Sequence, residues 1–262
     1  MRIVTFASGS TGNCSLITEG RANILIDAGI SMRRTLAALE SLGLAPRDLC
    51  GVLITHEHSD HISGLPMLVK HHNVKVFAPK ALCGVLADMK PQIKNNLNYI
   101  PEDDKSDVGG IAVSCFRTPH DAAYSVGYRF EGNNNTVAYA TDTGSISDEL
   151  VRGLEGAELA LIEANHDTEM LRTGPYPYYL KRRILSPRGH LSNDDSGKLA
   201  MHLAKSGTKH IILGHLSREN NTPELAYKTV YDAISTENAE ISVAPMNNLL
   251  AVTAGERVKC LV

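Results

Sequence analysis

The chain has 262 residues, a formal net charge of −3 at pH 7, 43% hydrophobic residues and 21% charged residues. This is the composition of an ordinary globular protein, and the length suffices for one substantial core, so we expect a single domain over residues 1–262. No apolar run approaches the roughly 20 residues that a transmembrane helix needs, which excludes a membrane protein of the helical class.

The first residues and the cysteines bear on the cellular compartment. Met1-Arg2-Ile3-Val4 enters a predicted strand directly, without the apolar stretch of a signal peptide. The five cysteines, at positions 14, 50, 83, 115 and 260, are an odd number with wide spacing. Such cysteines suit free thiols in a reducing compartment, so we expect a cytoplasmic protein with no membrane partner.

Three short strands are predicted at the start of the chain, over residues 2–6, 14–19 and 22–26. The loop Phe6–Ser15 joins the first two, and its small residues let backbone amides approach an anion closely. We therefore take Ser10 and Asn13 as candidate substrate-binding residues. A plain hairpin turn without a ligand is the alternative.

The next segment predicts a helix over Met32–Leu44, a strand over 52–55, a helix over 64–72 that His71 and His72 close, and a strand over 75–77. Residues 80–107 are polar and poorly periodic, and we make no prediction for them.

The run His56-Glu57-His58-Ser59-Asp60-His61 directly follows the strand at 52–55. Folding alone does not require three imidazoles and a carboxylate within six residues. Side chains alternate along an extended chain, so His56 and His58 can face one metal ion, and the following turn can direct Asp60 and His61 to a second. A polar surface loop is the alternative, and we predict a dinuclear metal site.

Six residues cannot complete two coordination shells, so distant segments must contribute. Three predicted strands each end near a single histidine or aspartate: 111–116 before His120, 136–140 before Asp142, and 210–214 before His215. Each alone is typical of a capped strand end. Together with the hexapeptide they predict ligands that converge at one edge of a sheet.

The remaining predicted elements are a strand over Leu159–Ile162, helices over 192–206 and 223–236, and a strand over 248–253. Strands flanked by helices in two similar halves predict an α/β (α+β) protein with a four-layer αββα sandwich. We interpret His202 and His210 as surface or core-edge groups.

Asp27, the H-x-H-x-D-H run, His120, Asp142 and His215, in this order, resemble the signature of the metallo-β-lactamase fold superfamily. The resemblance covers nearly the whole chain and implies that fold. It also implies ligand roles: His56, His58 and His120 for one ion, Asp60, His61 and His215 for the other, and Asp142 as a bridge. Asp27 would hydrogen-bond the ligand loop from outside, unless it is a helix N-cap.

This ligand set points to phosphoester hydrolysis. Five neutral imidazoles, two carboxylates, two divalent ions and one hydroxide carry a net charge of about +1, which attracts anions and stabilises a phosphoryl transition state. The bridging hydroxide would attack the scissile phosphate. Zinc, manganese and iron all suit mixed histidine and carboxylate ligands. A thioester or lactam hydrolase of similar fold remains an alternative.

Residues 176–190 form a basic stretch that carries Lys181, Arg182, Arg183 and Arg188 among tyrosines and contains no acidic residue. Phosphate contacts and base stacking would use such a stretch, and we take Arg188 as substrate-binding. The alternative is an exposed basic helix face with the tyrosines packed on the core.

Gly189-His190-Leu191-Ser192 resembles the element in which nucleic-acid-cutting members of the superfamily carry an extra histidine. The resemblance implies that His190 stabilises the scissile phosphate and protonates the leaving oxygen, and we take Asp60 as catalytic with it. Glu163 would orient His190 by a hydrogen bond. Asn165 and His166 follow a predicted strand and can reach the same sheet edge as substrate-binding residues.

The S-G-S-x-G-N-C start and the E-A-N-H-D, R-G-H-L-S-N and G-H-L-S-R-E-N-N elements together resemble the narrower YycJ/WalJ-type branch. That resemblance implies an exonuclease that degrades duplex DNA from the 5′ end, with DNA ends as its partner. The alternatives are a small-molecule hydrolase acting on a cyclic phosphodiester or thioester, and a regulatory metal-binding protein without turnover. The sequence makes no prediction of oligomeric state.

Overall fold

Alternation along the strands divides the protein into layers. In β1 (Arg2–Ala7), Ile3 belongs to a core between two sheets, whereas its neighbour Val4 belongs to a core beneath helices. In β12 (His210–Gly214), Ile212 lies in the central core, and Ile211 and Leu213 pack beneath helices on the other side. Strands that are buried on both faces read as continuous apolar runs, as these do.

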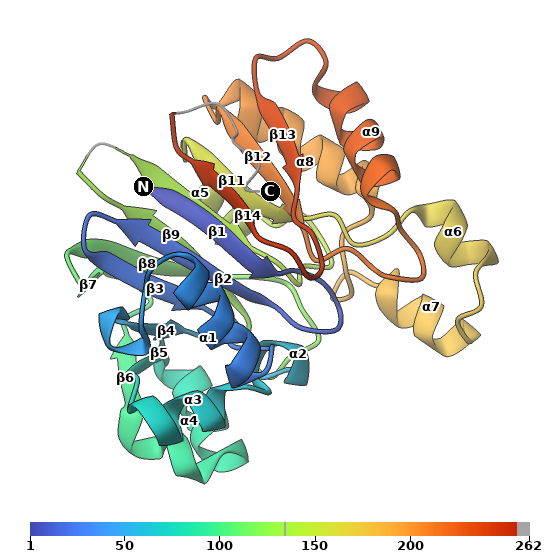
Figure 1. Cartoon of the computed structure of the whole chain (residues 1–262). Coiled ribbons are helices and arrows are strands. Elements are labelled where there is room, and N and C mark those ends of the chain that lie inside the picture. The colour runs from blue at the N-terminus through green and yellow to red at the C-terminus, as the bar shows by residue number, and fades with distance from the viewer. Residues whose placement is uncertain (134, 256–262) are drawn as a thin grey trace.

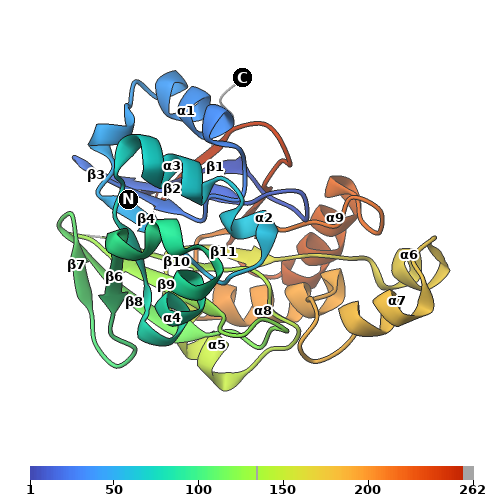
Figure 2. The same cartoon turned by 90° about the horizontal axis from the view of Figure 1, so that it is seen from below.

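The computed structural model describes residues 1–133 and 135–255. Two seven-stranded sheets pack face to face, and helices cover the outer face of each (Figure 1). Figure 2 shows α1 (Met32–Ser41) and α3 (Leu65–His72) on one side of the sheets, with α5 (Asp148–Leu154) and α8 (Asn193–Lys205) on the other. The predicted four-layer αββα sandwich is confirmed.

The first sheet has the order β14-β1-β2-β3-β4-β5-β6. Its further strands are β2 (Cys14–Glu19), β3 (Ala22–Ile26), β4 (Gly51–Leu53), β5 (Val76–Pro79), β6 (Leu97–Ile100) and β14 (Leu250–Thr253). Pairing is antiparallel from β14 to β3 and parallel from β3 to β6. Side chains from α1, α3 and α4 (Lys80–Met89) pack on its outer face.

The second sheet has the order β13-β12-β11-β10-β9-β8-β7. Its further strands are β7 (Ser106–Val108), β8 (Ile111–Arg117), β9 (Val126–Glu131), β10 (Thr136–Ala140), β11 (Leu159–Glu163) and β13 (Glu240–Val243). Pairing again changes from antiparallel (β7 to β10) to parallel (β10 to β13). Side chains from α5, α8 and α9 (Pro223–Ile234) cover it.

The remaining elements are α2 (Ser59–Ile62), α6 (Thr168–Thr173), α7 (Tyr178–Ile184) and 3-10 helices at Pro46–Asp48 and Pro91–Asn96. The α6–α7 segment projects beyond the sheets in both views (Figures 1 and 2). We call residues 168–184 the arm.

Parallel register brings the polar strand ends of the second sheet together. Strands β11 and β12 pair from Leu159↔His210 to Glu163↔Gly214. Strands β10 and β11 pair up to Ala140↔Ile162. The residues just beyond these pairs therefore lie side by side at the carboxyl edge, where ligands of open α/β sheets bind.

The predicted elements are present, with ends that differ by a few residues. The predicted helix Met32–Leu44 ends at Ser41, because the backbone turns at Gly43, which has φ +72°. Residues 80–107, left without a prediction, form α4, a 3-10 helix, β6 and β7. Strands β9 and β13 and the helices α2, α5, α6 and α7 were not predicted. The α4 helix was not predicted, although its buried residues Leu82, Cys83 and Leu86 have helical spacing.

Two further observations bear on the expectations for cysteines and membranes. The cysteines in the described part of the chain, Cys14, Cys50, Cys83 and Cys115, are free, and Cys260 lies outside the described residues. Among the described residues, no helix combines the length and apolarity needed to cross a bilayer.

Candidate metal centre and adjoining cavity

Seven histidine and aspartate side chains meet at one edge of the sandwich. The His56–His61 run lies between β4 and α2, and His120, Asp142 and His215 follow β8, β10 and β12. Their ligand-type atoms form overlapping sets, each with all atoms within 4.8 Å of one another. These sets are His56, His58 and His120; Asp60, His61 and His215; and His56, His61 and Asp142. The structure thus brings together all seven residues that the sequence singled out as ligands.

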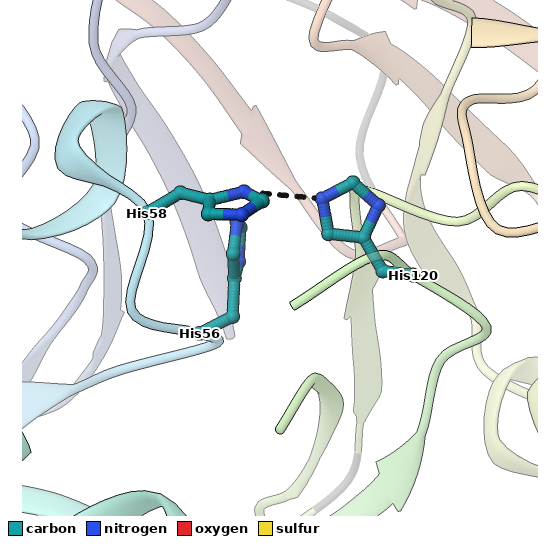
Figure 3. Close-up of side chains that lie close together, drawn as sticks. All are labelled: His56, His58 and His120. Carbon is teal, nitrogen blue, oxygen red and sulfur yellow. Dashed lines mark hydrogen bonds between the residues drawn. The ribbon is translucent and has the colours of Figure 1, made fainter. Parts of the chain in front are cut away.

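The first set consists of three histidines. Figure 3 shows the rings of His58 and His120 facing each other, with His56 beside His58. His58 Nδ1 lies 3.2 Å from His120 Nε2. The ring centroid of His56 lies 4.6 Å from that of His58 and 5.0 Å from that of His120. Three imidazoles directed at one point are a typical zinc-type donor set.

In the second set, two histidines approach the same carboxylate, Asp60, and one of them also approaches Asp142. His61 Nε2 lies 3.5 Å from Asp60 Oδ2 and 3.2 Å from Asp142 Oδ2. His215 Nε2 lies 3.5 Å from the same Asp60 oxygen. Asp142 therefore stands between the two sets, close to His61 on one side and 3.7 Å from His120 Nε2 through its other oxygen.

A protein partner fixes one nitrogen of most of these rings. His61 Nδ1 donates to Asp27 Oδ2 at 2.7 Å, and His120 Nδ1 donates to the Gly189 carbonyl at 3.1 Å. His215 Nδ1 donates to Glu163 Oε1 at 2.8 Å, and His56 Nδ1 lies 3.0 Å from Thr55 Oγ1. Each of these four rings is left with Nε2 directed into the cluster, the arrangement of metal-binding histidines with outer partners.

Atoms without a partner test whether metal ions fit. Among the described residues, His56 Nε2, His215 Nε2 and Asp142 Oδ2 are buried and have no hydrogen-bond partner. Buried polar atoms of native proteins are almost always satisfied, so three such atoms in one cluster need an explanation. Divalent cations bound within these sets would satisfy all three. The residues present therefore fit metal ions.

Asp27 lies outside the cluster and holds the ligand loop. Its Oδ1 accepts from the Thr55 backbone N–H at 2.9 Å, and its Oδ2 accepts from His61 Nδ1. The alternative N-cap role for Asp27 is wrong, because Ser31 caps α1 and accepts from Arg34 N.

Three of these polar residues have left-handed backbones just beyond strand ends: Asp27 (φ +60°), Asp142 (φ +56°) and His215 (φ +56°). This region is uncommon for residues other than glycine, and such residues gather at functional sites. Asp142 and His215 belong to the cluster, and Asp27 holds its ligand loop.

Glu163, the last residue of β11, joins two histidines. Its Oε1 accepts from His190 Nδ1 at 2.7 Å as well as from His215 Nδ1. Its Oε2 accepts from the Thr143 N–H at 2.9 Å and from the Leu191 N–H at 3.3 Å. The hydrogen bond expected between Glu163 and His190 is present, and it leaves Nε2 as the free nitrogen of His190.

The pKa values of the cluster follow from burial and mutual charge. Burial lowers the pKa of His61, but Asp142 and Asp27 outweigh it and hold the pKa well above its usual range. Burial raises the pKa of Asp142, but the surrounding histidines hold it well below its usual range. Burial and its histidine neighbours lower the pKa of His56 strongly. Without metal the cluster therefore stores protons beside carboxylates, and cations would replace those protons.

A cavity of about 210 Å³ opens beside the cluster. The residues that line it fall into three chemical groups: candidate metal ligands and the adjoining His190, neutral polar residues, and residues of the arm. They are His58, Asp60, Asp142, His215 and His190; Ser10, Asn165 and Ser217; and Tyr176, Leu180, Arg183 and Ile184. Of the five predicted substrate-binding residues, Ser10 and Asn165 line this cavity.

The other three lie elsewhere. Asn13 is buried within its loop, where its Oδ1 accepts from Gly9 N at 2.9 Å. His166 is 1% exposed, and burial lowers its pKa to about 4. Arg188 donates to the backbone carbonyls of His120 at 2.9 Å and Ala122 at 3.3 Å. None of the three lines the cavity. Asn13, whose Nδ2 lies 3.0 Å from His61 Nε2, and Arg188 instead hold loops of the site, whereas both ring nitrogens of His166 are buried without a hydrogen-bond partner.

The arm does not have the tyrosines packed on the core that the alternative interpretation of the basic stretch predicted. Tyr178 and Tyr179 are each 75% exposed, so these tyrosines do not pack on the core. Sequence reasoning missed Thr55, which binds Asp27 and His56. It included Arg183 and Tyr176 in the basic stretch but did not select either as a site residue, and both line the cavity. Thr55 directly precedes the hexapeptide, a signal that was available. Nothing in the local sequence distinguishes Arg183 from its basic neighbours.

Comparison with known proteins agrees with this geometry. Residues 22–216 match the family model described as β-lactamase superfamily domain. The chain is 38% identical over 239 residues to exodeoxyribonuclease YycJ of Bacillus anthracis, covering 91% of this chain and 90% of that protein. It is 37% identical over 240 residues to exodeoxyribonuclease WalJ of Streptococcus pneumoniae strain D39, covering 90% and 89%. Among solved structures, Zn²⁺-bound PqqB of Methylobacterium extorquens shares the fold, with a TM-score of 0.74, 16% identity and coverage of 97% and 100%.

Proposed function

This chain belongs to the β-lactamase superfamily, in the branch that contains YycJ and WalJ, and from that premise we propose that it is a metal-dependent exodeoxyribonuclease. The observation that carries the proposal is the position of Asp142 between two groups of ligand-type side chains, with a hydrogen-bonded histidine, His190, at the same cavity. Both of these relatives share nearly the full length of this chain and are named exodeoxyribonucleases.

Two divalent cations would be held by His56, His58, His120 and Asp142 on one side and by Asp60, His61, His215 and Asp142 on the other. Bound there, zinc or manganese (or iron) would lower the pKa of a water molecule and neutralise charge on a phosphodiester. We propose that the substrate is a duplex DNA end and that the protein degrades it from the 5′ end. We also propose that the protein is cytoplasmic and that residues 1–262 act as one domain.

The residues of the chain have separate tasks in this proposal. Glu163 fixes Nδ1 of His190, which leaves Nε2 to donate a proton to the leaving oxygen. Asp60 lines the cavity, where it would bind a cation and place a negative charge near the scissile phosphate. Ser10 and Asn165 face the incoming strand, and Asn13, His166, Arg188 and Asp27 hold the loops that carry these groups.

The test is direct. Metal-free protein is reconstituted separately with manganese and zinc and incubated with duplex DNA labelled at the 5′ or the 3′ end. We expect progressive release of nucleotides from the 5′ end that depends on metal and disappears in Asp142→Asn. Intact DNA, together with turnover of a cyclic phosphodiester or a thioester, would refute the nuclease and leave a metabolite hydrolase with the same metal centre.

A further inference from the structure

The four basic residues of the stretch 176–190 have different partners. Lys181 Nζ donates to the backbone carbonyls of Arg172 at 2.7 Å and Gly174 at 2.8 Å, which ties α7 to α6. Arg188 is tied to carbonyls of the loop after β8. Arg182 lies over the Tyr178 ring, with 5.9 Å from its Cζ to the ring centroid. Of the four, only Arg183 lines the cavity.

Arg183 is held at the cavity by a single carboxylate. Its Nε donates to Asp121 Oδ2, and its Nη2 donates to Asp121 Oδ1 at 3.2 Å. Asp121 directly follows the candidate ligand His120, and its Oδ1 lies 3.4 Å from His120 Nε2. This pair spans the gap between the metal cluster and the arm. The side chain of Arg183 remains 53% exposed, so water and ligands can reach the guanidinium.

The chemistry of this position suits a phosphate. A guanidinium offers several N–H donors in a planar fork, and it binds phosphate oxygens with two parallel hydrogen bonds. Asp121 occupies only part of the fork and orients the rest. The lining of the cavity also includes Ser10, Asn165 and Ser217, which carry neutral hydroxyl and amide groups. An anion in this cavity would thus meet the guanidinium of Arg183, neutral polar groups and residues of the metal cluster.

We propose that the cavity is a binding subsite for a nucleotide of the scissile strand and that Arg183, oriented by Asp121, binds its phosphate. The inference rests on the proposed function for the identity of the strand, but the phosphate site itself stands on the geometry of the cavity. Asp121 is a positioning residue in this arrangement, because it acts through Arg183. The hydrogen bonds of Lys181 with Arg172 and Gly174 connect α7, which carries Arg183, to the end of α6.

The experiment measures binding of thymidine 5′-monophosphate, a small phosphate monoester, to manganese-loaded protein by titration calorimetry. We expect Arg183→Ala to weaken binding about 10- to 100-fold, as loss of a charge-assisted pair of hydrogen bonds does. Arg183→Lys should recover part of the affinity. Arg182→Ala is the matched control, an adjacent arginine outside the cavity, and it should change the affinity less than threefold.

Removal of Arg183 also unmasks the charge of Asp121, which could itself repel phosphate. The double variant Arg183→Ala/Asp121→Asn separates these effects. Binding restored to the wild-type level in the double variant would overturn the proposal, because repulsion by Asp121 would then explain the whole loss. Equal affinities of Arg183→Ala and Arg182→Ala, or no binding to wild type, would overturn it as well.

The same variants keep this inference distinct from the proposed function. If wild type degrades DNA and Arg183→Ala shows an unchanged KM for DNA and unchanged nucleotide binding, the exonuclease stands and the phosphate site fails. If wild type leaves DNA intact but binds the nucleotide through Arg183, the phosphate site stands and the exonuclease fails.

Discussion

The proposed proton donation by His190 depends on one hydrogen bond, from its Nδ1 to Glu163. Glu163 Oε1 lies between His190 Nδ1 and His215 Nδ1, so one carboxylate fixes both a cavity-lining imidazole and a candidate ligand. Burial lowers the pKa of His190, but the charge of Glu163 and its hydrogen bond outweigh burial and raise it. A raised pKa keeps more of the imidazole protonated, the form that a proton donor needs.

We therefore predict that His190→Ala lowers kcat for DNA by about 10²–10⁴-fold, the contribution of a positioned general acid. Bound metal, measured by elemental analysis, should stay at the wild-type level. His190 also belongs to a possible ligand set with Asp142, Glu163 and His215, so metal loss in His190→Ala would identify His190 as a ligand and contradict its role as proton donor.

At the scale of the element, the arm is the part of the fold that neither sheet requires. Its helices project beyond the sandwich (Figure 1), yet Leu180, Arg183 and Ile184 of α7 line the cavity. The same helix presents Tyr178 and Tyr179 to solvent. Exposed aromatic rings beside a basic helix are typical of surfaces on which unpaired bases stack.

Replacing both tyrosines tests this surface. We predict that Tyr178→Ala/Tyr179→Ala weakens binding of a short single-stranded DNA about 10-fold or more in a fluorescence anisotropy titration, since one base stack contributes about 1–3 kcal/mol. Tm should not change, because neither ring is buried. The matched control is Tyr227→Ala/Tyr231→Ala, a stacked and exposed pair on α9. Equal DNA affinity in the two double variants would mean that the arm does not bind DNA.

At the scale of the whole molecule, the metal centre joins the two sheets. His56, His58, Asp60 and His61 extend from the first sheet, and His120, Asp142 and His215 extend from the second. Ligands from both sheets converge on the same point only in the folded state. Cations bound there stabilise the native protein by mass action, since the unfolded chain has no such site.

Removal of metal should therefore destabilise the protein as well as inactivate it. We predict that a chelator lowers Tm by about 5–15 °C, since saturation at 100–1,000 times Kd contributes about 2.7–4.1 kcal/mol and each kcal/mol shifts Tm by about 2–4 °C at this size. Scanning calorimetry measures the shift. Asp142→Asn should show a much smaller response to chelator. A Tm that is the same with and without chelator in the wild type would contradict a shared centre between the sheets.

The sequence by itself determined the layers and the seven residues of the cluster. Strand periodicity is local, so runs such as 22–26 and 210–214 could be assigned from their own residues. A concentrated H-x-H-x-D-H run and single polar residues at strand ends are equally local signals. The edge strands β6, β7 and β13 were harder to predict. Short edge strands are only partly buried, so the hydrophobic pattern of their residues is weak.

Only the tertiary structure decided how the cluster is supported and what lines the cavity. The hydrogen bond between Asp27 and His61 joins residues 34 positions apart. Glu163 contacts histidines 27 and 52 positions away, and Arg183 pairs with Asp121 across 62 positions. No periodicity encodes such pairs, because each depends on how two separately folded segments meet. The same reason explains why Arg188 was taken as substrate-binding while Arg183, five residues away, is the arginine that lines the cavity.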